Sequence, residues 1–321
     1  MILTGPPGTA KTTLAELTCV LASSAELCSG YTLTTATSDW TTYDTIGGLR
    51  PNGSGNALEF REGLFLEAAR AGRWLVVDEL NRSNFDRAFG QLFTVLSGQS
   101  VVLPYEDPAN GRRIALIPEG AAGRYDAADY ALLRIRRSWR IVATMNVFDK
   151  SLLFEMSFAL MRRFAFIEVP SPSAAVFATL WRRELDGLPE KRIVETEHVL
   201  TGLLELRSVK DIGPAVFIDM ARFSREYIGH DMPGSAQELT FQLFYSYLLP
   251  QFEGVTRLQG LDLFRKARRL VGSQHGDRLR STLTDVLGVE LPTSPLPADD
   301  ESDRDLQADS DEVDNLLPDA Q

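Results

Sequence analysis

The amino-acid sequence predicts an α/β core, with a parallel sheet between two helical layers, followed by an all-α domain. Three observations support this. An apolar run at residues 1–4 leads through a glycine-rich turn into a helical pattern. Two later runs, the apolar residues 74–77 and the mainly apolar residues 141–145, lack alternation and end at polar residues, which is typical of strands buried on both faces of a parallel sheet. From residue 172 to residue 287 the pattern is helical throughout, with six expected helices.

The first strand and helix enclose the glycine-rich stretch GPPGTAKTT. A phosphate-binding loop requires this order of strand, turn, Lys-Thr and helix. The glycines let backbone N–H groups turn toward the phosphates, and the helix N-terminus adds partial positive charge. Lys11 is expected to reach the β- and γ-phosphates, and the Thr12 hydroxyl to ligate Mg²⁺. The predicted nucleotide-binding residues are Gly5, Pro6, Pro7, Gly8, Thr9, Ala10, Lys11, Thr12 and Thr13.

Ala10 stands where such loops have their last glycine. If the position needs a positive φ, alanine costs roughly 1–2 kcal/mol. If the position is already helical, alanine costs nothing. The sequence leaves both conformations open. A chance glycine-rich turn before a helix is the alternative to a phosphate-binding loop.

Length and charge suggest two domains and an acidic tail. With 321 residues, 44% of them hydrophobic, the chain can bury a sizeable core. Of its net charge of −11, residues 298–321 contribute −9, from ten acidic residues and Arg304. Such a tail is expected to be disordered and solubilising, and a docking arm for a basic partner is the alternative.

Other features predict a cytoplasmic protein. Cys19 and Cys28 form neither a metal motif nor a disulfide framework, which fits a reducing compartment. No apolar run approaches the about 18 residues that a membrane-spanning helix needs, and the start does not resemble a signal peptide. The three histidines match no metal-ligand spacing.

Two acids end the buried strand at residues 74–77. In a nucleotide hydrolase, Asp78 would hold the water shell of Mg²⁺, and Glu79 would polarise the attacking water. The carboxyl ends of parallel strands are also where such sheets bind ligands. Residues 85–97 then predict one amphipathic helix.

Further candidate residues follow the next strands. Asn146 ends the strand at residues 140–146 and could orient the water or contact the γ-phosphate. A helix predicted for residues 151–161 leads to Arg162 and Arg163, just before a strand. An arginine there can project into a neighbouring subunit and neutralise transition-state charge, and a structural ion pair is the alternative.

Two hairpins are predicted for residues 47–60 and 101–117. Arg134, Arg136, Arg137 and Arg140 crowd the approach to a later strand. This arginine cluster is interpreted as a solvated face, with a subunit interface or polyanion contact as the alternative.

The segments GPPGTAKT, WLVVDELNR, IVATMN and ALMRRF resemble the AAA+ ATPases, in the branch of dynein-related, MoxR-like and McrB-like proteins. The resemblance covers roughly residues 1–291 and is strongest to the McrB-like members, which often assemble as hexameric rings. It implies a P-loop NTPase core and a helical lid. It also implies Walker A roles for Lys11 and Thr12, and Walker B roles for Asp78 and Glu79. Asn146 would be sensor 1, and Arg162 or Arg163 the arginine finger in trans.

The expected domains are a nucleotide-binding core at 1–170, a lid at 171–291 and the acidic tail at 292–321. Only three residues precede Thr4, so we expect either missing upstream sequence or an unusually short strand. Residues 212–217 lie where many relatives carry a sensor 2 arginine, but the first arginine that follows is Arg222. Hydrolysis is therefore expected to be weak or to need another subunit.

The resemblance leads to an oligomeric, Mg²⁺-dependent ATPase that remodels or translocates a protein or DNA client. Asn146 and Asp149 have an N-x-x-D spacing similar to that of guanine-binding GTPases, so GTP stays open while ATP is favoured. A nucleotide-dependent scaffold with little turnover and the motor subunit of a McrBC-like restriction system are the alternatives. The partner would be a McrC-like nuclease or a von Willebrand A-domain protein. Direct DNA binding is not expected of a near-neutral body with an acidic tail.

Overall fold

The computed structural model describes residues 1–51, 58–121, 125–146, 157–229 and 235–291. The chain forms two compact units, Met1–Gln251 and Phe252–Gln321. The first contains all the strands that the structure describes, together with several helices. The second contains two longer helices.

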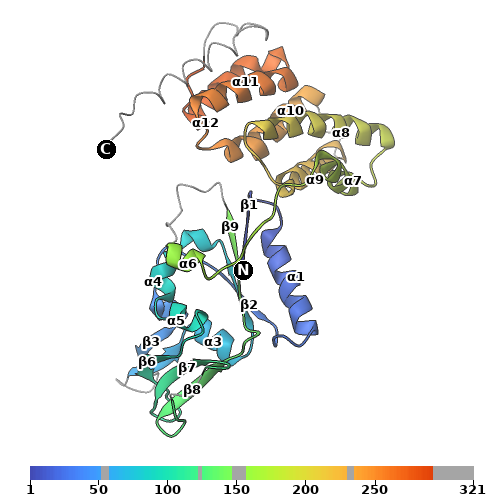
Figure 1. The fold of residues 1–321 in the computed structure, drawn as a ribbon. Coiled ribbons are helices and arrows are strands. Elements are labelled where there is room, and N and C mark those ends of the chain that lie inside the picture. Colours follow the sequence, from blue (N-terminus) through green and yellow to red (C-terminus); the bar gives the residue numbers. More distant parts are fainter. Residues whose placement is uncertain (52–57, 122–124, 147–156, 230–234, 292–321) are drawn as a thin grey trace, which may run out of the picture. The chain divides into compact units, whose positions relative to one another are not determined.

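A five-stranded parallel sheet forms the centre of the first unit (Figure 1). Its strand order is β10-β1-β9-β5-β2, so β1 lies in the interior of the sheet. In the register of the sheet, Gly5 of β1 pairs with Asn146 of β9, and Thr35 of β2 pairs with Asp78 of β5. The carboxyl ends of these strands therefore meet at one edge. The strands are β1 (Ile2–Gly5), β2 (Tyr31–Thr35), β5 (Trp74–Asp78), β9 (Ile141–Asn146) and β10 (Phe166–Glu168).

Helices cover both faces of this sheet. Figure 1 shows α1 (Lys11–Ser24) on one side, and α3 (Leu64–Arg70), α4 (Phe85–Phe89) and α5 (Leu92–Leu96) on the other. Residues 74–77 of β5 are all buried, as the run without alternation predicts. The predicted three-layer α/β core is therefore confirmed.

The prediction of one helix at residues 85–97 is wrong. The chain forms α4 and α5, which are separated at Gly90. Gly90 has φ 35° and ψ −110°, a backbone conformation outside the α-helical region. Buried residues from both helices, among them Phe85, Phe89 and Leu92, still belong to one apolar core. The spacing of apolar residues correctly predicts which side chains are buried, but it does not predict that the helix is interrupted at Gly90.

Two small sheets extend the first unit. The predicted hairpins are confirmed as the antiparallel pairs β3–β4 and β6–β7, and α2 (Thr42–Thr45) precedes the first. A third strand, β8, pairs parallel with β7. Their bounds are β3 (Gly47–Pro51), β4 (Leu58–Glu62), β6 (Val101–Glu106), β7 (Arg113–Pro118) and β8 (Tyr130–Ile135).

The remainder of the described chain is mainly helical, as predicted. Within the first unit it forms α6 (Phe158–Met161), α7 (Ala174–Glu184), α8 (Glu190–Leu204), α9 (Pro214–Gly229) and α10 (Ala236–Leu243). The second unit contains α11 (Arg257–Val271) and α12 (Gly276–Leu287), which pack against each other. Short turns of other helix types are η1 (Leu80–Arg82), η3 (Glu205–Ser208), η4 (Phe244–Leu248), η5 (Leu249–Phe252) and η6 (Ser273–His275).

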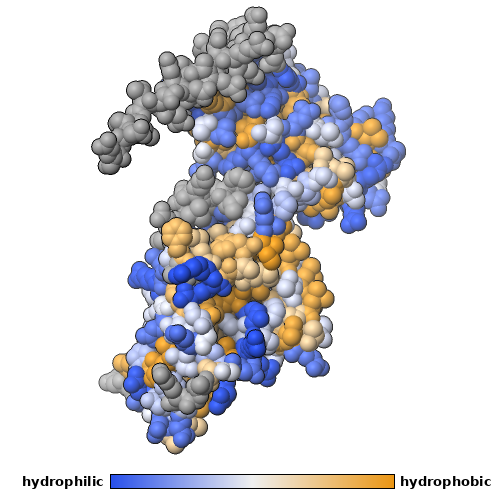
Figure 2. Space-filling view, in the orientation of Figure 1, coloured by the Kyte–Doolittle hydropathy of each residue, from blue (hydrophilic) through white to orange (hydrophobic). Residues whose placement is uncertain are grey.

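One face of α1 is apolar and exposed. Leu14, Leu17 and Leu21 follow a helical spacing and are 41%, 53% and 70% exposed, and Val20 lies beside them. Figure 2 shows this hydrophobic surface in orange over α1. Contiguous exposed apolar side chains of this kind mark interaction surfaces. Among the described residues, none of the helices combines the length and apolarity that a bilayer crossing requires.

Candidate functional site

The glycine-rich loop between β1 and α1 contains residues in unusual backbone conformations. Gly8 has φ 76°, and Ala10, at the N-cap of α1, has φ 61° and ψ 27°. Ala10 is therefore in the left-handed region, which settles the question that the sequence left open. An alanine there is strained by roughly 1–2 kcal/mol relative to the right-handed region.

Gly5 is required for close packing. A Cβ atom on Gly5 would lie 2.2 Å from the carbonyl oxygen of Val169. The segment after β10 therefore passes directly beside the end of β1, where any larger residue would clash.

The segment expected to carry sensor 2 also contacts the loop. A Cβ on Gly213 would lie 2.2 Å from the carbonyl oxygen of Pro7, and the Ala215 N–H donates to the carbonyl of Gly8 at 3.4 Å. The next arginine, Arg222, forms ion pairs with Glu184 and Asp219. Residues 212–217 thus approach the loop through backbone atoms and small side chains, with no arginine among them.

The Lys11 side chain is buried against the loop. Its Nζ donates to the carbonyls of Gly5 and Pro6 at 3.1 and 2.6 Å. Burial lowers the pKa of Lys11 from its usual value, and the negative charges of Asp78 and Glu79 oppose this shift. A cation held by neutral carbonyls in a buried site favours an anionic ligand, because that ligand would stabilise its charge.

A hydrogen-bond network centres on Asp78. Asp78 Oδ1 accepts a bond from the Thr12 hydroxyl at 2.7 Å and a second from the Thr144 hydroxyl. The Thr144 Oγ1 in turn accepts the Glu79 N–H at 3.0 Å. The network joins α1, β5 and β9 at the carboxyl edge of the sheet. Hydroxyl and carboxylate oxygens are the ligands that Mg²⁺ prefers, so Thr12 and Asp78 fit the predicted metal-binding role.

Sequence reasoning missed Thr144. It lies two residues before Asn146 on β9, on the same side of the strand by the two-residue period. A threonine inside an otherwise apolar buried run was the available signal. Thr144 is 2% exposed, so its hydroxyl needs a partner, and Asp78 provides one.

Glu79 is also in the left-handed region, with φ 52°. Its carboxylate forms an ion pair with Arg82 of η1, three residues later. Arg82 is not among the site residues predicted from the sequence. Its position in a turn directly after the two acids was the only signal for it.

Asn146 is placed beside the loop by strand pairing, because its Cα is the register partner of Gly5. Thr4, the preceding residue of β1, pairs with Met145. The Asp149 of the N-x-x-D spacing lies outside the described residues.

The two adjacent arginines after α6 differ in their surroundings. The Arg163 Nε donates to Ser97 Oγ at 2.7 Å, and its guanidinium lies 5.7 Å from the centre of the Phe93 ring. Arg162 is exposed, and within the described part of the chain no side-chain hydrogen bond or ion pair holds it. Arg163 is thus anchored within its own chain, whereas Arg162 has no such side-chain contact among the described residues.

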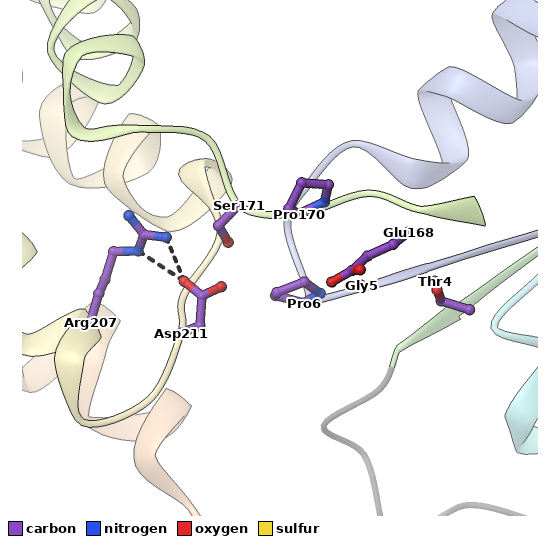
Figure 3. A pocket seen from close by; sticks show the side chains of 8 residues that line it. All are labelled: Thr4, Gly5, Pro6, Glu168, Pro170, Ser171, Arg207 and Asp211. Atoms are coloured by element: carbon purple, nitrogen blue, oxygen red, sulfur yellow. Dashed lines mark hydrogen bonds and ion pairs between the residues drawn. The ribbon is translucent and has the colours of Figure 1, made fainter. Parts of the chain in front are cut away.

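A pocket of about 410 Å³ opens beside the start of the loop (Figure 3). Figure 3 shows Gly5, Pro6 and Glu168 on one side, facing the ion pair of Arg207 and Asp211. The lining residues are Thr4, Gly5, Pro6, Glu168, Pro170, Ser171, Arg207 and Asp211. Because Pro6 belongs to the loop that would hold phosphates, the pocket adjoins the candidate phosphate site.

Comparison with known proteins gives one family match and two similar proteins. The family of AAA domains of the dynein-related subfamily matches residues 1–164. The EcoKMcrB subunit of the type IV methyl-directed restriction enzyme of Escherichia coli K12 is 25% identical over 180 residues. That alignment covers 53% of this chain and 35% of the relative, so the chain matches about a third of its length. A solved structure of a candidate ATPase from Cytophaga hutchinsonii is 13% identical, with a TM-score of 0.34, covering 91% of this chain and 85% of that chain.

Replacing Ala10 by glycine is expected to stabilise the protein. Glycine adopts φ 61° without strain, so Ala10→Gly should raise the free energy of unfolding by about 1 kcal/mol, even after its greater unfolded-state entropy. Ala15→Gly, in the helical interior of α1, is the matched control and should lower it by about 1 kcal/mol. Denaturant unfolding measures both. Equal losses in the two variants would contradict a left-handed Ala10.

Asp78→Asn should separate Mg²⁺ binding from nucleotide binding. The amide keeps the volume of the side chain but removes its charge, so the gain in nucleotide affinity on adding Mg²⁺ should fall at least tenfold, while affinity in EDTA changes little. Titration of a fluorescent nucleotide with and without Mg²⁺ measures this, with Asp129→Asn as an exposed control. An unchanged Mg²⁺ effect would exclude Asp78 from the metal's surroundings.

Proposed function

The chain belongs to the AAA domains of the dynein-related subfamily, and we propose that it is a Mg²⁺-dependent nucleoside-triphosphatase that hydrolyses ATP as an oligomer. The observation that carries the proposal is the Asp78 network, which joins the candidate phosphate loop to Asp78 of β5 and to Glu79, the residue after it. In this proposal residues 1–170 are the nucleotide-binding core, residues 171–291 the lid, and residues 292–321 a separate acidic segment. The protein would be cytoplasmic.

Each residue has a proposed role in hydrolysis. Lys11 would exchange its carbonyl partners for the oxygens of the β- and γ-phosphates, and the backbone N–H groups of the loop would bind the same oxygens. Thr12 and Asp78 would hold Mg²⁺, which neutralises charge on the phosphates. Glu79 would accept the proton of the attacking water, and Asn146 would orient that water.

The pocket beside Pro6 is the proposed position of the nucleoside. It adjoins the loop on the β1 side, and its two carboxylates, Glu168 and Asp211, offer hydrogen-bond acceptors. ATP is the proposed substrate, with GTP as the alternative. Steady-state hydrolysis of both nucleotides, measured side by side, decides between them.

Glu79→Gln is the central test of hydrolysis. The amide cannot accept the proton, so kcat should fall at least 100-fold while nucleotide affinity stays within about threefold. Glu59→Gln changes an exposed carboxylate of β4 in the same way and should leave both unchanged. An unaltered kcat in Glu79→Gln would show that another group activates the water.

A homo-oligomeric ring is supported by two surface features. The exposed apolar face of α1 is suited to protein contact. Exposed Arg162, rather than anchored Arg163, could reach a nucleotide in the next subunit. In this arrangement each site is completed by its neighbour.

Mixing two inactive variants tests the contribution in trans. Arg162→Ala should lower kcat at least 100-fold, and mixing it with Glu79→Gln should restore part of the activity, because intact Glu79 then meets intact Arg162 at some interfaces. The Arg163→Ala variant serves as the comparison. It should lose stability through its Ser97 and Phe93 contacts, and its mixture with Glu79→Gln should restore no more activity than its own residual turnover predicts. Failure of the first mixture would assign the arginine to its own site.

A second candidate function is a nucleotide-dependent scaffold with little turnover. It is favoured by residues 212–217, which contact the loop. This segment contains no arginine that could act on the phosphates. Nucleotide binding without hydrolysis at any protein concentration would support it.

The client of the motor is proposed from the relatives alone. The similarity to the EcoKMcrB subunit suggests the motor of a McrBC-like restriction system, working with a McrC-like nuclease. A von Willebrand A-domain partner and a protein client are the alternative. Co-purification of the full chain with either candidate partner distinguishes them.

A further inference from the structure

We propose that the acidic segment at residues 298–321 docks on a basic face of α11 and α12 in its own chain. The basic face consists of Arg265, Arg268, Arg269 and Arg280. This inference is independent of nucleotide hydrolysis. It concerns what occupies a charged surface of the second unit.

Three arginines of α11 share one side of the helix. Arg265, Arg268 and Arg269 follow the spacing i, i+3 and i+4, which brings side chains together on a helix surface. The buried side is formed by other positions of α11, among them Leu263, Phe264 and Ala267. Arg269 is exposed, and Arg265 and Arg268 are half-buried.

The two helices contribute to the same face through Phe264. The guanidinium of Arg268 lies 6.0 Å from the centre of this ring, and that of Arg280, from α12, lies 5.5 Å from it. The Nε of Arg268 would also lie 3.6 Å from a Cβ on Gly276, the first residue of α12. The partial positive charge of that helix N-terminus therefore adds to the charge of the arginines.

Two of the charged donors on this face lack acceptors within the described part of the chain. The Nε atoms of Arg265 and Arg280 are buried and have no hydrogen-bond partner among the described residues. Two nearby acids form ion pairs with basic residues of α11 and α12: Asp277 with Arg280 at 3.5 Å, and Asp262 with Lys266 at 2.7 Å. Neither pair provides an acceptor for the two Nε atoms. A buried charged donor without an acceptor is costly, so the face favours an anionic partner.

The chain carries a matching anion a short distance away. Residues 257–287 contain seven Lys or Arg and three acidic residues, a net charge of +4, whereas residues 298–321 carry −9. No other stretch of the chain has comparable negative charge. Charge complementarity therefore points to this segment as the occupant.

The acidic segment can reach the face. Val289, just after α12, packs against Gly260, since a Cβ there would lie 2.7 Å from the Val289 side chain. From Gly260 to Arg268 the rise along α11 is about 12 Å, and residues 292–297 can span about 20 Å when extended. A short linker gives an effective concentration of about 1 mM, so even a weak intrinsic affinity keeps such a segment docked.

Docking has a consequence for polyanions. The acidic segment would compete with phosphate polymers for the same arginines, so the chain would bind them weakly as long as its own segment is in place. The contact should weaken with salt, because exposed charges are screened beyond about 10 Å at 0.1 M ionic strength.

Energy transfer within the full chain tests the docking directly. Cys19 and Cys28 are buried, so dyes placed on Gln321→Cys and Thr284→Cys report the distance from the end of the chain to α12. Transfer should be high at 50 mM NaCl and fall at 500 mM. A variant with the ten acids of residues 298–321 changed to amides should show the low value at both salt concentrations.

Arginine variants locate the contact. Changing Arg265, Arg268 and Arg269 together to Gln should lower transfer as the neutral segment does, and changing them to Lys should restore it, which separates charge from misfolding. The matched control changes Arg134, Arg136 and Arg137, an exposed cluster in the first unit, to Gln. The proposal would be overturned if energy transfer stayed the same at both salt concentrations and in the variant with the neutral segment. It would also be overturned if transfer fell equally in the control variant, or if transfer rose with protein concentration.

Heparin binding provides a second readout. The neutral segment should raise heparin affinity at least tenfold at 50 mM NaCl, and this gain should disappear when the three arginines of α11 are Gln. An equal gain without those arginines would mean that the segment acts only by general repulsion, and the docking site would be wrong.

Discussion

The Asp78 carboxylate is the interaction on which the site depends. One of its oxygens accepts hydrogen bonds from the hydroxyl groups of Thr12 and Thr144. These bonds connect the first turn of α1 and the end of β9 to β5. Because Thr144 also accepts the Glu79 N–H, the same contact orients the backbone of the second acid. Loss of this one carboxylate would leave the buried Thr144 hydroxyl and the half-buried Thr12 hydroxyl without this partner and remove a tie between α1 and the sheet.

Backbone strain is concentrated at the same edge. Ala10 and Glu79 are two of the three non-glycine residues with positive φ that the structure describes, and both directly adjoin the Asp78 network. Strain of this kind persists only where surrounding contacts hold it. The Lys11 contacts with Gly5 and Pro6 hold the loop, and the Arg82 ion pair holds Glu79. These contacts therefore keep two unfavourable backbone conformations in place, which would preorganise the candidate binding site.

The sequence predicted elements whose signal is local. The buried runs at β5 and β9 and the glycine-rich loop were identified because burial on both faces and special backbone geometry restrict which residues fit. It did not predict Thr144 as a partner of Asp78, because that contact depends on the register between β9 and β5. The parallel pairing of β8 with β7 and the break at Gly90 were missed for a similar reason. Both depend on tertiary packing, which overrides local pattern.

Net charge also proved to be a poor guide to local electrostatics. A net charge of −11 suggests little affinity for phosphates. However, Lys11 is a buried cation at the loop, and α11 and α12 together form a basic surface. At physiological salt, charges act over about 8 Å, so a ligand responds to the side chains near it rather than to the total. The acidic residues 298–321 dominate the sum through number alone. The charge that matters for each ligand is therefore set by which groups the fold brings within that distance.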